Sequence, residues 1–220
     1  MPKRLKIDFI SDIACPFCAI GLKGLDEALA SLADEVDAEL IFHPFEINPD
    51  LPPEGQNVGE NLREKYGDMA EHSHSDRPSL SDRAKEVGVD VALAHGDRFY
   101  NTFDAHRLLH WAKLEGKQKE LKEALFTAYL SDKRDISNHA ILVDLAQSVG
   151  LERDGAIDVL QSGRFSRFVR MSEELSISRG ITAVPAIIVN DEYLISGGQP
   201  ATVFAHILRE IAAKTESHSS

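Results

Sequence analysis

The pattern of apolar and polar positions predicts strands near both ends of the chain and helices between them. Residues 5–10 alternate between apolar and polar side chains, which is the period of a strand with one buried face. Leucines then recur every three or four residues over residues 22–32, as on the apolar face of an amphipathic helix. Residues 38–43 form a second predicted strand, which ends at Pro44.

The pattern then changes to helical spacing before it returns to strands. A loop rich in proline and glycine follows the second strand, and helical stripes continue over residues 58–179. Two short apolar runs separated by Asn190-Asp191-Glu192 predict a hairpin, and a last amphipathic helix follows. The hairpin strands and the last helix span residues 186–189, 193–196 and 200–213.

This order of elements predicts an α/β fold, with a central mixed sheet and flanking helices, that is interrupted by a large insertion. Residues 1–55 and 180–214 would form one discontinuous domain, and residues 56–179 an all-helical insertion after the second strand. Residues 215–220 are polar and terminal, and we expect them to be a disordered tail. The two ends of the sequence would therefore contribute strands to one sheet.

Cys15 and Cys18 are the only cysteines in 220 residues, and they lie between the first predicted strand and the first helix. The Cys-x-x-Cys spacing is typical of a redox-active pair. Pro16 suits the first turn of a helix, because its missing N–H needs no partner there, so Cys15 lies at or beside the helix N-terminus. The positive end of the helix dipole favours a thiolate at Cys15. We therefore expect Cys15 to attack a substrate disulfide and Cys18 to resolve the mixed disulfide.

The two residues between the cysteines, Pro16 and Phe17, bring no charge to the pair. Without a histidine at this place, no imidazolium adds to the stabilisation of the thiolate. We therefore predict a less oxidising couple than a Cys-Pro-His-Cys pair would give.

Two other interpretations of the cysteine pair remain open in the sequence. A structural zinc ion takes four ligands, and the chain has no second cysteine pair, although His43 or the stretch with His72 and His74 could complete a mixed site. The two cysteines could also be inert core residues. Pro16 at a helix start argues against coincidence, so we predict a redox pair and no metal.

Four further motifs accompany the motif Ser-Asp-x-x-Cys-Pro-x-Cys along the chain. They read His-Pro-Phe-Glu-Ile-Asn-Pro, Asn-Thr-Phe-Asp-Ala-His-Arg-Leu, Gly-Ile-Thr-Ala-Val-Pro-Ala and Ser-Gly-Gly-Gln-Pro, at residues 43–49, 101–108, 180–186 and 196–200. In this order the motifs resemble those of the DsbA-like thioredoxin-fold oxidoreductases and, among them, of the cytoplasmic FrnE-like branch. The resemblance covers nearly the whole chain and implies a thioredoxin-like fold.

The resemblance also implies roles that spacing alone does not identify. In thioredoxin-like folds the proline that corresponds to Pro185 has a cis peptide bond and lies against the active-site disulfide. A cis bond between Val184 and Pro185 would expose the backbone of Val184 for pairing with a substrate peptide. Pro16, Phe17, Val184 and Pro185 are therefore the expected supporting residues of the pair.

Three polar residues are weaker candidates for a proton relay or a substrate contact. Glu46 follows the second strand, where a partly buried carboxylate could accept the proton of Cys18, although a loop carboxylate in water is the alternative. Asn101 and His106 belong to the middle motif and could face the active site from the insertion. His106 also lies on an apolar stripe, so a hydrogen-bonded core histidine is equally consistent with the pattern.

The composition narrows the setting of this chemistry. The chain has 24 basic and 36 acidic residues and a formal net charge of −12, which argues against nucleic acid or an anionic membrane as a partner. No apolar segment follows the basic N-terminus, and no run approaches the roughly 20 apolar residues of a membrane span. We expect a cytoplasmic monomer or homodimer whose partners are protein or low-molecular-weight thiols and disulfides.

The sequence therefore predicts a thiol-disulfide oxidoreductase that reduces, oxidises or isomerises disulfides through a mixed disulfide. No cofactor is expected, and glutathione is a candidate co-substrate. A glutathione-dependent isomerase or transferase is the main alternative, because hydroxychromene-carboxylate isomerases and kappa-class transferases resemble the same architecture, typically with serine where Cys15 stands. Two retained thiols favour the oxidoreductase. A non-enzymatic redox-sensitive holdase or metal-buffering protein is the third hypothesis.

Overall fold

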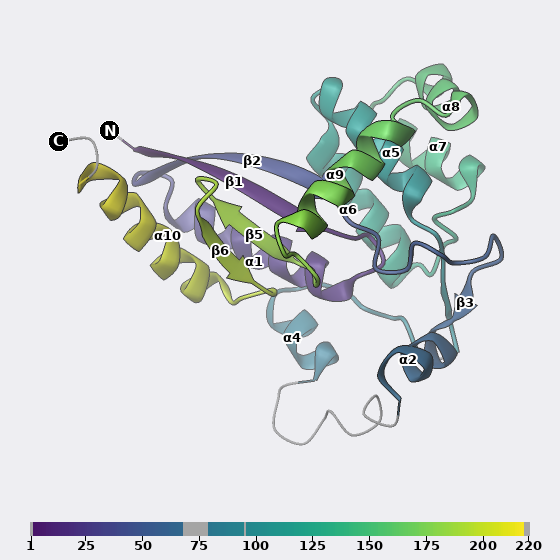
Figure 1. The fold of residues 1–220 in the computed structure, drawn as a ribbon, viewed down its shortest axis with the longest axis horizontal. Helices are drawn as coiled ribbons and strands as arrows, with labels where there is room; N and C mark the ends of the chain where they lie inside the picture. Colours follow the sequence, from purple (N-terminus) through teal and green to yellow (C-terminus); the bar gives the residue numbers. More distant parts are fainter. Residues whose placement is uncertain (1, 68–78, 95, 218–220) are drawn as a thin grey trace.

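The computed structural model describes residues 2–67, 79–94 and 96–217, and a four-stranded mixed sheet lies at its centre (Figure 1). In spatial order the strands are β2 (Val36–Pro44), β1 (Lys3–Ser11), β5 (Ala186–Val189) and β6 (Tyr193–Ser196). β2 is parallel to β1, whereas β5 is antiparallel to both β1 and β6. Strands from both ends of the sequence thus form one sheet, as the hydrophobic pattern predicts.

The register of the sheet brings three segments of the chain to one edge. β1 ends at Ser11, which lies opposite Pro44 at the end of β2. β5 runs the other way and begins with Ala186 opposite Ile10 of β1. The loops that follow β1 and β2 therefore meet the segment that precedes β5. This arrangement places the cysteine loop against residues 184–185.

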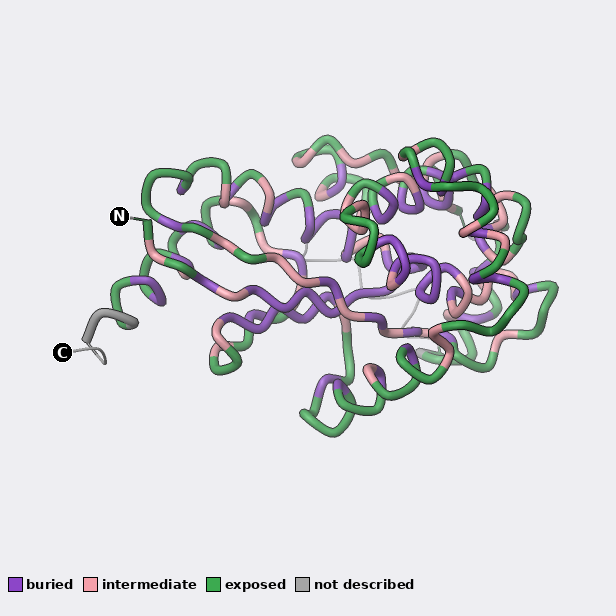
Figure 2. The backbone as a smooth tube through the Cα atoms, turned by 90° about the horizontal axis from the view of Figure 1, so that it is seen from above, coloured by how far each residue is buried: buried purple, intermediate pink, exposed green. Residues whose placement is uncertain are grey.

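Two long helices, α1 (Pro16–Ser31) and α10 (Ala201–Ser217), pack against each other along the sheet. Their buried apolar residues recur at helical spacing and include Leu22, Leu25 and Ala28 in α1 and Phe204, Leu208 and Ile211 in α10. Figure 2 shows buried segments along the strands and the inner helices, with exposed backbone at the periphery. The helix that begins at the cysteine loop therefore packs its apolar face into the hydrophobic core.

The last helix is longer than the pattern predicts. α10 continues through Ser217, so residues 215–217 of the expected disordered tail are helical, and residues 218–220 lie outside the described part of the chain. The residues before this point, Ala212 to Lys214, favour a helix, and no proline or glycine follows them. The prediction was wrong because helix propensity carries the helix beyond its last buried apolar residue.

The segment between β2 and β5 is mostly helical, but it is not all-helical as predicted. Its helices are α2 (Val58–Tyr66), α4 (Leu80–Glu86), α5 (Phe103–Leu114), α6 (Gln118–Phe126), the π-helical turn η1 (Thr127–Ser131), α7 (His139–Ser148), α8 (Arg153–Ser162) and α9 (Ser166–Ser178). Two short strands, β3 (Gln56–Asn57) and β4 (Arg98–Phe99), pair antiparallel to form a ribbon.

The ribbon depends on a close approach that only glycine allows. Gly55 has a φ of +72°, and a Cβ at this position would lie 2.2 Å from the carbonyl oxygen of Phe99. Strands of two residues have no period that a sequence pattern could reveal, which is why the ribbon was not predicted.

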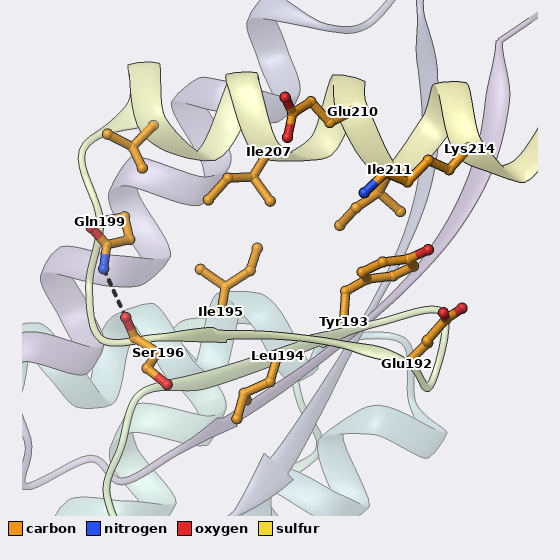
Figure 3. Close-up of a pocket in the computed structure, with 11 residues that line it drawn as sticks. Glu192, Tyr193, Leu194, Ile195, Ser196, Gln199, Ile207, Glu210, Ile211 and Lys214 are labelled. Carbon is orange, nitrogen blue, oxygen red and sulfur yellow. Dashed lines mark hydrogen bonds between the residues drawn. The ribbon is translucent and has the colours of Figure 1, made fainter.

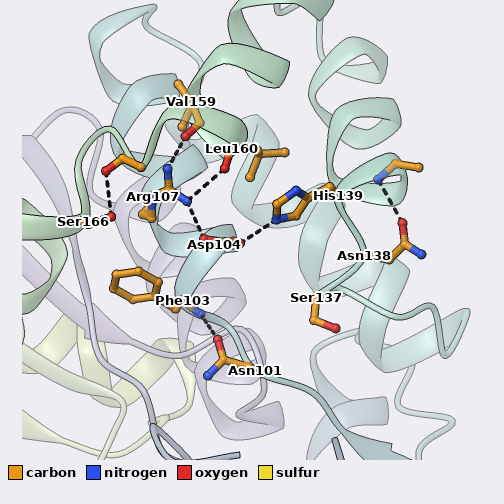
Figure 4. A network of polar contacts seen from close by, with 12 residues as sticks. Asn101, Phe103, Asp104, Arg107, Ser137, Asn138, His139, Val159, Leu160 and Ser166 are labelled. Carbon is orange, nitrogen blue, oxygen red and sulfur yellow. Dashed lines mark hydrogen bonds and ion pairs between the residues drawn. The ribbon is translucent and has the colours of Figure 1, made fainter. Parts of the chain in front are cut away.

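A buried arginine ties α5 to the helices around it (Figure 4). The Arg107 guanidinium donates to the Asp104 carboxylate at 2.5 Å and to the carbonyl oxygen of Val159 in α8. The Asp104 carboxylate also binds His139 of α7 at 2.6 Å. These contacts fix the orientation of α5, which carries His106 toward the cysteine loop.

Candidate active site

The two cysteines lie at the start of α1, where the sequence predicts them. Cys15 is the N-cap residue of α1, and Pro16 opens its first turn. No acidic residue lies in this turn, and the Cys15 side chain accepts no hydrogen bond from its N–H groups. Cys15 is 7% exposed, whereas Cys18 is completely buried. The two thiols are therefore unequal in their access to a substrate.

The segment before β5 covers the cysteine pair. The peptide bond between Val184 and Pro185 is cis, as the resemblance implies. The carbonyl oxygen of Val184 accepts a hydrogen bond from the Cys15 thiol, with 3.6 Å between sulfur and oxygen. The backbone of Val184 thus lies beside the sulfur that a substrate must reach.

Phe17 is held between the helix and two other segments. A Cβ on Gly198 would lie 2.8 Å from the Phe17 carbonyl oxygen, so the loop before α10 packs directly on the cysteine motif. The guanidinium of Arg83, from α4, lies 5.1 Å from the centroid of the Phe17 ring and donates to the Gly198 carbonyl oxygen. Arg83 thus brings a positive charge to a motif whose middle residues carry none. The less oxidising couple, which was inferred from those two residues alone, stays a prediction.

Asp12 joins the cysteine loop to two other segments. Its carboxylate, 1% exposed, accepts hydrogen bonds from the N–H of Ala14 at 3.3 Å and of Ile47 at 2.8 Å. The Nε2 atom of His106 lies 3.3 Å from Oδ1, the oxygen that accepts from Ala14, whereas Ile47 donates to Oδ2. Burial raises the pKa of Asp12, but the contacts with His106 and the Ile47 N–H outweigh burial and hold this pKa below its usual value. Asp12 is therefore a buried carboxylate that fixes the loop before Cys15.

The surroundings of Cys18 shift the pKa of its thiol in opposite directions. Burial raises the pKa of the Cys18 thiol well above its usual value, and the hydrogen bond to Cys15 adds to this. The backbone N–H of Asp12 and the positive charge of Lys122 lower the same pKa. Lys122, from α6, is itself only 1% exposed. A thiol with a raised pKa must lose its proton before it can attack a disulfide.

Glu46 is buried. The alternative that Glu46 is a loop carboxylate in water is therefore wrong. Its carboxylate is bound by the Arg170 guanidinium and, at 3.2 Å, by the amide of Asn101. The N–H of Glu46 donates to the Glu173 carboxylate at 3.0 Å, and Arg170 also binds Glu173, at 2.9 Å. Burial and then the charge of Glu173 raise the pKa of Glu46 to about 7, although Arg170 opposes them. Two carboxylates thus share one guanidinium.

Folding stability should fall as the pH rises through the pKa of Glu46. The folded carboxyl keeps its proton up to about pH 7, whereas the unfolded one loses it near 4.5, so the folded state binds more protons between these values. In Glu46→Gln the side chain stays neutral at every pH. We therefore expect the loss of unfolding free energy between low and high pH to be smaller in this variant by on the order of 1–2 kcal/mol, a figure reduced because solvent screens the half-exposed Arg170.

Urea unfolding of both proteins at about pH 5 and about pH 8 measures this difference. The matched control is Glu39→Gln, because Glu39 pairs with Arg4 at the surface and its replacement should leave the pH dependence unchanged. If wild type and Glu46→Gln lose the same stability between the two pH values, Glu46 does not titrate in this range.

The structure brings six of the predicted site residues together at the N-terminus of α1. These residues are Cys15, Pro16, Phe17, Cys18, Val184 and Pro185. His106 joins them as a buried histidine that binds Asp12. Asn101 and Glu46 instead bind each other beside Arg170, and they connect to the cysteine loop through the contact of Ile47 with Asp12.

Sequence reasoning missed four charged residues of the site and of the Glu46 cluster beside it, namely Asp12, Arg83, Lys122 and Arg170. Asp12 stands in the cysteine motif, but no role followed from its position. The burial of Lys122 could have been predicted, because Lys122 lies four residues before Phe126 on the helix face that also carries the buried Leu121 and Leu125. No sequence pattern could have predicted the contacts of Arg83 with Gly198 and of Arg170 with Glu46, since the partners are 115 and 124 residues apart along the chain.

A groove of about 540 Å³ lies between β6 and α10, away from this chemistry (Figure 3). Tyr193 and Ile195 line one side and Ile207 and Ile211 the other, and neither cysteine belongs to its lining. In the part of the chain that the structure describes, no three His, Cys, Asp or Glu side chains are grouped to hold a metal ion. His72 and His74 lie outside that part. None of the described helices is long and apolar enough to span a membrane.

A mixed sheet, a helix that begins with a Cys-x-x-Cys pair and a cis-proline segment against that pair define a thioredoxin-like dithiol protein. The chain belongs to the DSBA-like thioredoxin domain family, whose model matches residues 6–209. Family membership indicates a thiol-disulfide oxidoreductase or a related isomerase, acting on thiols or disulfides.

Solved structures agree with this assignment. The chain is similar to the probable DsbA oxidoreductase SCO1869 from Streptomyces coelicolor, with 30% identity, a TM-score of 0.82 and coverage of 94% of this chain and 89% of that chain. A 2-hydroxychromene-2-carboxylate isomerase shares the fold at 15% identity and a TM-score of 0.68, covering 98% of this chain and 100% of that chain. The cytosolic disulfide reductase DsbM from Pseudomonas aeruginosa, solved with GSH, shares it at 18% identity and a TM-score of 0.60, covering 94% and 98%.

Proposed function

We propose that the protein is a thiol-disulfide oxidoreductase that works through the dithiol of Cys15 and Cys18. The observation that carries the proposal is the inequality of the two thiols at one helix N-terminus. Cys15 occupies the N-cap position of the helix, beside the Val184 carbonyl oxygen, and retains some exposed surface, while Cys18 is fully buried one turn further in. A two-step exchange needs one sulfur that meets the substrate and one that meets only the first sulfur.

In the direction of substrate reduction, the reaction passes through a mixed disulfide. The Cys15 thiolate attacks one sulfur of the substrate disulfide, and the other substrate sulfur leaves as a thiolate. Cys18 then loses its proton and attacks the Cys15 sulfur, so that the second substrate sulfur leaves. The substrate gains two electrons, and Cys15 and Cys18 end as a disulfide. Two molecules of a thiol such as glutathione return the pair to the dithiol and leave as one disulfide, and no bound cofactor is required.

Reduction of protein or low-molecular-weight disulfides in the cytoplasm fits this chemistry best. A reducing compartment keeps the pair in the dithiol form, and DsbM, which shares the fold, is described as a cytosolic disulfide reductase. The backbone of Val184 would pair with the substrate chain beside the reacting sulfur. The FrnE-like branch and a monomeric or homodimeric state remain predictions from the sequence.

A glutathione-dependent isomerase is the second candidate, because the 2-hydroxychromene-2-carboxylate isomerase shares the fold over nearly the whole chain. Wild-type protein should accelerate the reduction of insulin by glutathione in proportion to its concentration, and it should not isomerise hydroxychromene carboxylate. Isomerisation without disulfide exchange would contradict the proposal. Suppression of insulin aggregation without thiol turnover would also contradict it and would support a holdase.

A further inference from the structure

Helix α9 carries a cluster of apolar side chains on its exposed face. In the part of the chain that the structure describes, seven large apolar side chains are exposed, and four of them belong to this one helix. The four are Phe168, Met171, Leu175 and Ile177. In Figure 1 the helix lies in front of β1 and β2. Exposed apolar side chains that gather on one element are typical of an interaction surface.

Three of these side chains form a stripe along α9. Phe168, Met171 and Leu175 are separated by three and then four residues, which is the spacing of the apolar seam between two packed helices. The opposite face of α9, which includes Val169 and Glu173, is buried within the chain. The stripe therefore faces outward, although it has the pattern of a helix contact.

The first residue of the stripe is held in place by α5. The rings of Phe168 and His110 stack, with 3.5 Å between their centroids and 26° between their planes. The ring of Phe165, just before α9, contacts the same imidazole at an angle, with 4.8 Å between the centroids. A side chain that is already ordered loses less conformational entropy when a partner binds.

Two charged residues flank the stripe on the same side. Arg167 and Glu174 are exposed, and each directly precedes a residue of the stripe. They are seven residues apart, which is about two turns of the helix. Among the described residues neither has an ion-pair partner, whereas the neighbouring Arg170 binds Glu46. One positive and one negative charge are thus available to a partner.

We infer that this surface binds a second copy of the same chain, with the two α9 helices antiparallel across a twofold axis beside Met171. Under a twofold axis, each contact between two positions occurs twice, once in each direction. The midpoint between Phe168 and Leu175 lies within one residue of Met171, and so does the midpoint between Arg167 and Glu174. One axis therefore packs Phe168 on the partner's Leu175 and places Met171 against its own copy. The same axis brings Arg167 to the partner's Glu174 on both sides.

The charge pattern favours an antiparallel copy of the chain as the partner. Each copy has a formal net charge of −12, so two copies repel each other unless the contact surface has complementary charges of its own. A stripe flanked by Arg167 and Glu174 is complementary to itself when it is reversed. A parallel arrangement of the two helices would instead place like charges opposite each other.

Reversal of the two charges tests this arrangement. Arg167→Glu and Glu174→Arg should each raise the dissociation constant of the dimer by roughly 10-fold or more, because like charges then face each other twice. The double variant, with both changes, has opposite charges again and should return to near the wild-type constant. A mixture of the two single variants should form a heterodimer that is tighter than either homodimer. Analytical ultracentrifugation of the full chain measures these constants, with the cysteines kept reduced so that no intermolecular disulfide contributes.

Met171→Asp tests the position of the axis. It places two carboxylates against each other and should raise the dissociation constant by roughly 10²-fold or more. The matched control is Leu194→Asp, because Leu194 is 54% exposed, compared with 55% for Met171, but lies on β6. This control should dimerise as wild type does.

Three results would overturn the inference. They are a monomeric wild-type protein, wild-type dimerisation in both single charge variants, and a dimer that survives Met171→Asp but not Leu194→Asp. If wild type is monomeric and Met171→Asp slows insulin reduction, the stripe binds the substrate instead of a second copy. Disulfide exchange through Cys15 does not depend on any of these outcomes.

Discussion

Replacement of Cys15 by serine should reduce disulfide exchange by roughly 10³-fold or more, to the rate of the uncatalysed reaction. A hydroxyl cannot form the mixed disulfide. The other thiol cannot substitute for Cys15, because Cys18 is completely buried and its pKa is raised well above the usual value. Insulin reduction and exchange with glutathione, measured for wild type and for Cys15→Ser, give the two rates.

The structure of Cys15→Ser should survive the change. Serine is a preferred N-cap residue, so the variant should unfold at the same or a higher temperature than wild type. Thermal unfolding of the reduced proteins is therefore the control that separates lost chemistry from lost folding. A folded Cys15→Ser protein that keeps the wild-type rate would show that the activity does not use this dithiol.

Replacement of Asp12 by alanine should cost about 3–5 kcal/mol of folding stability, because it removes one partner of a buried network. The N–H groups of Ala14 and Ile47 and the ring of His106 would each lose an acceptor. Urea unfolding measures the loss. Asp37→Ala is the matched control, because Asp37 is exposed on β2 and its replacement should change stability by less than about 0.5 kcal/mol.

The same residue should contribute to acid sensitivity. Because the pKa of folded Asp12 is held below its usual value, its charge stabilises the folded state above about pH 4, and this contribution is lost as the pH falls further. Asp12→Asn, which keeps an acceptor oxygen but has no charge, should lack this part of the acid transition. An unchanged acid transition in Asp12→Asn would show that the carboxylate is not the stabilising form.

Local patterns were sufficient for the elements that position the site. The alternation in residues 5–10 and the proline at position 16 locate the end of β1 and the start of α1, because both are set by neighbours in the chain. The hairpin of β5 and β6 also has the predicted bounds. The β3–β4 ribbon and the end of α10 were missed, because one is too short for a period and the other depends on helix propensity without an apolar stripe.

The electrostatics of the site could not be predicted in the same way. The carboxylate of Glu46 pairs with Arg170, which lies 124 residues further along the chain, so only the folded structure reveals this contact. The place of Lys122 on the buried face of α6 could be read from the sequence, but the position of its ammonium group over the ring of Phe42 in β2 could not, because it depends on tertiary packing. Sequence motifs thus identified the thiols, whereas the groups that act on their protons required the structure.

Trapping of the mixed disulfide tests the central claim most directly. Reduced Cys18→Ser protein, mixed with a disulfide-bonded peptide, should accumulate a covalent adduct, because the resolving thiol is absent. Mass spectrometry of proteolytic fragments should place the peptide on Cys15, and dithiothreitol should release it. If Cys18→Ser forms no adduct at a concentration at which wild type reduces the peptide, Cys15 is not the nucleophile and the proposed function is wrong.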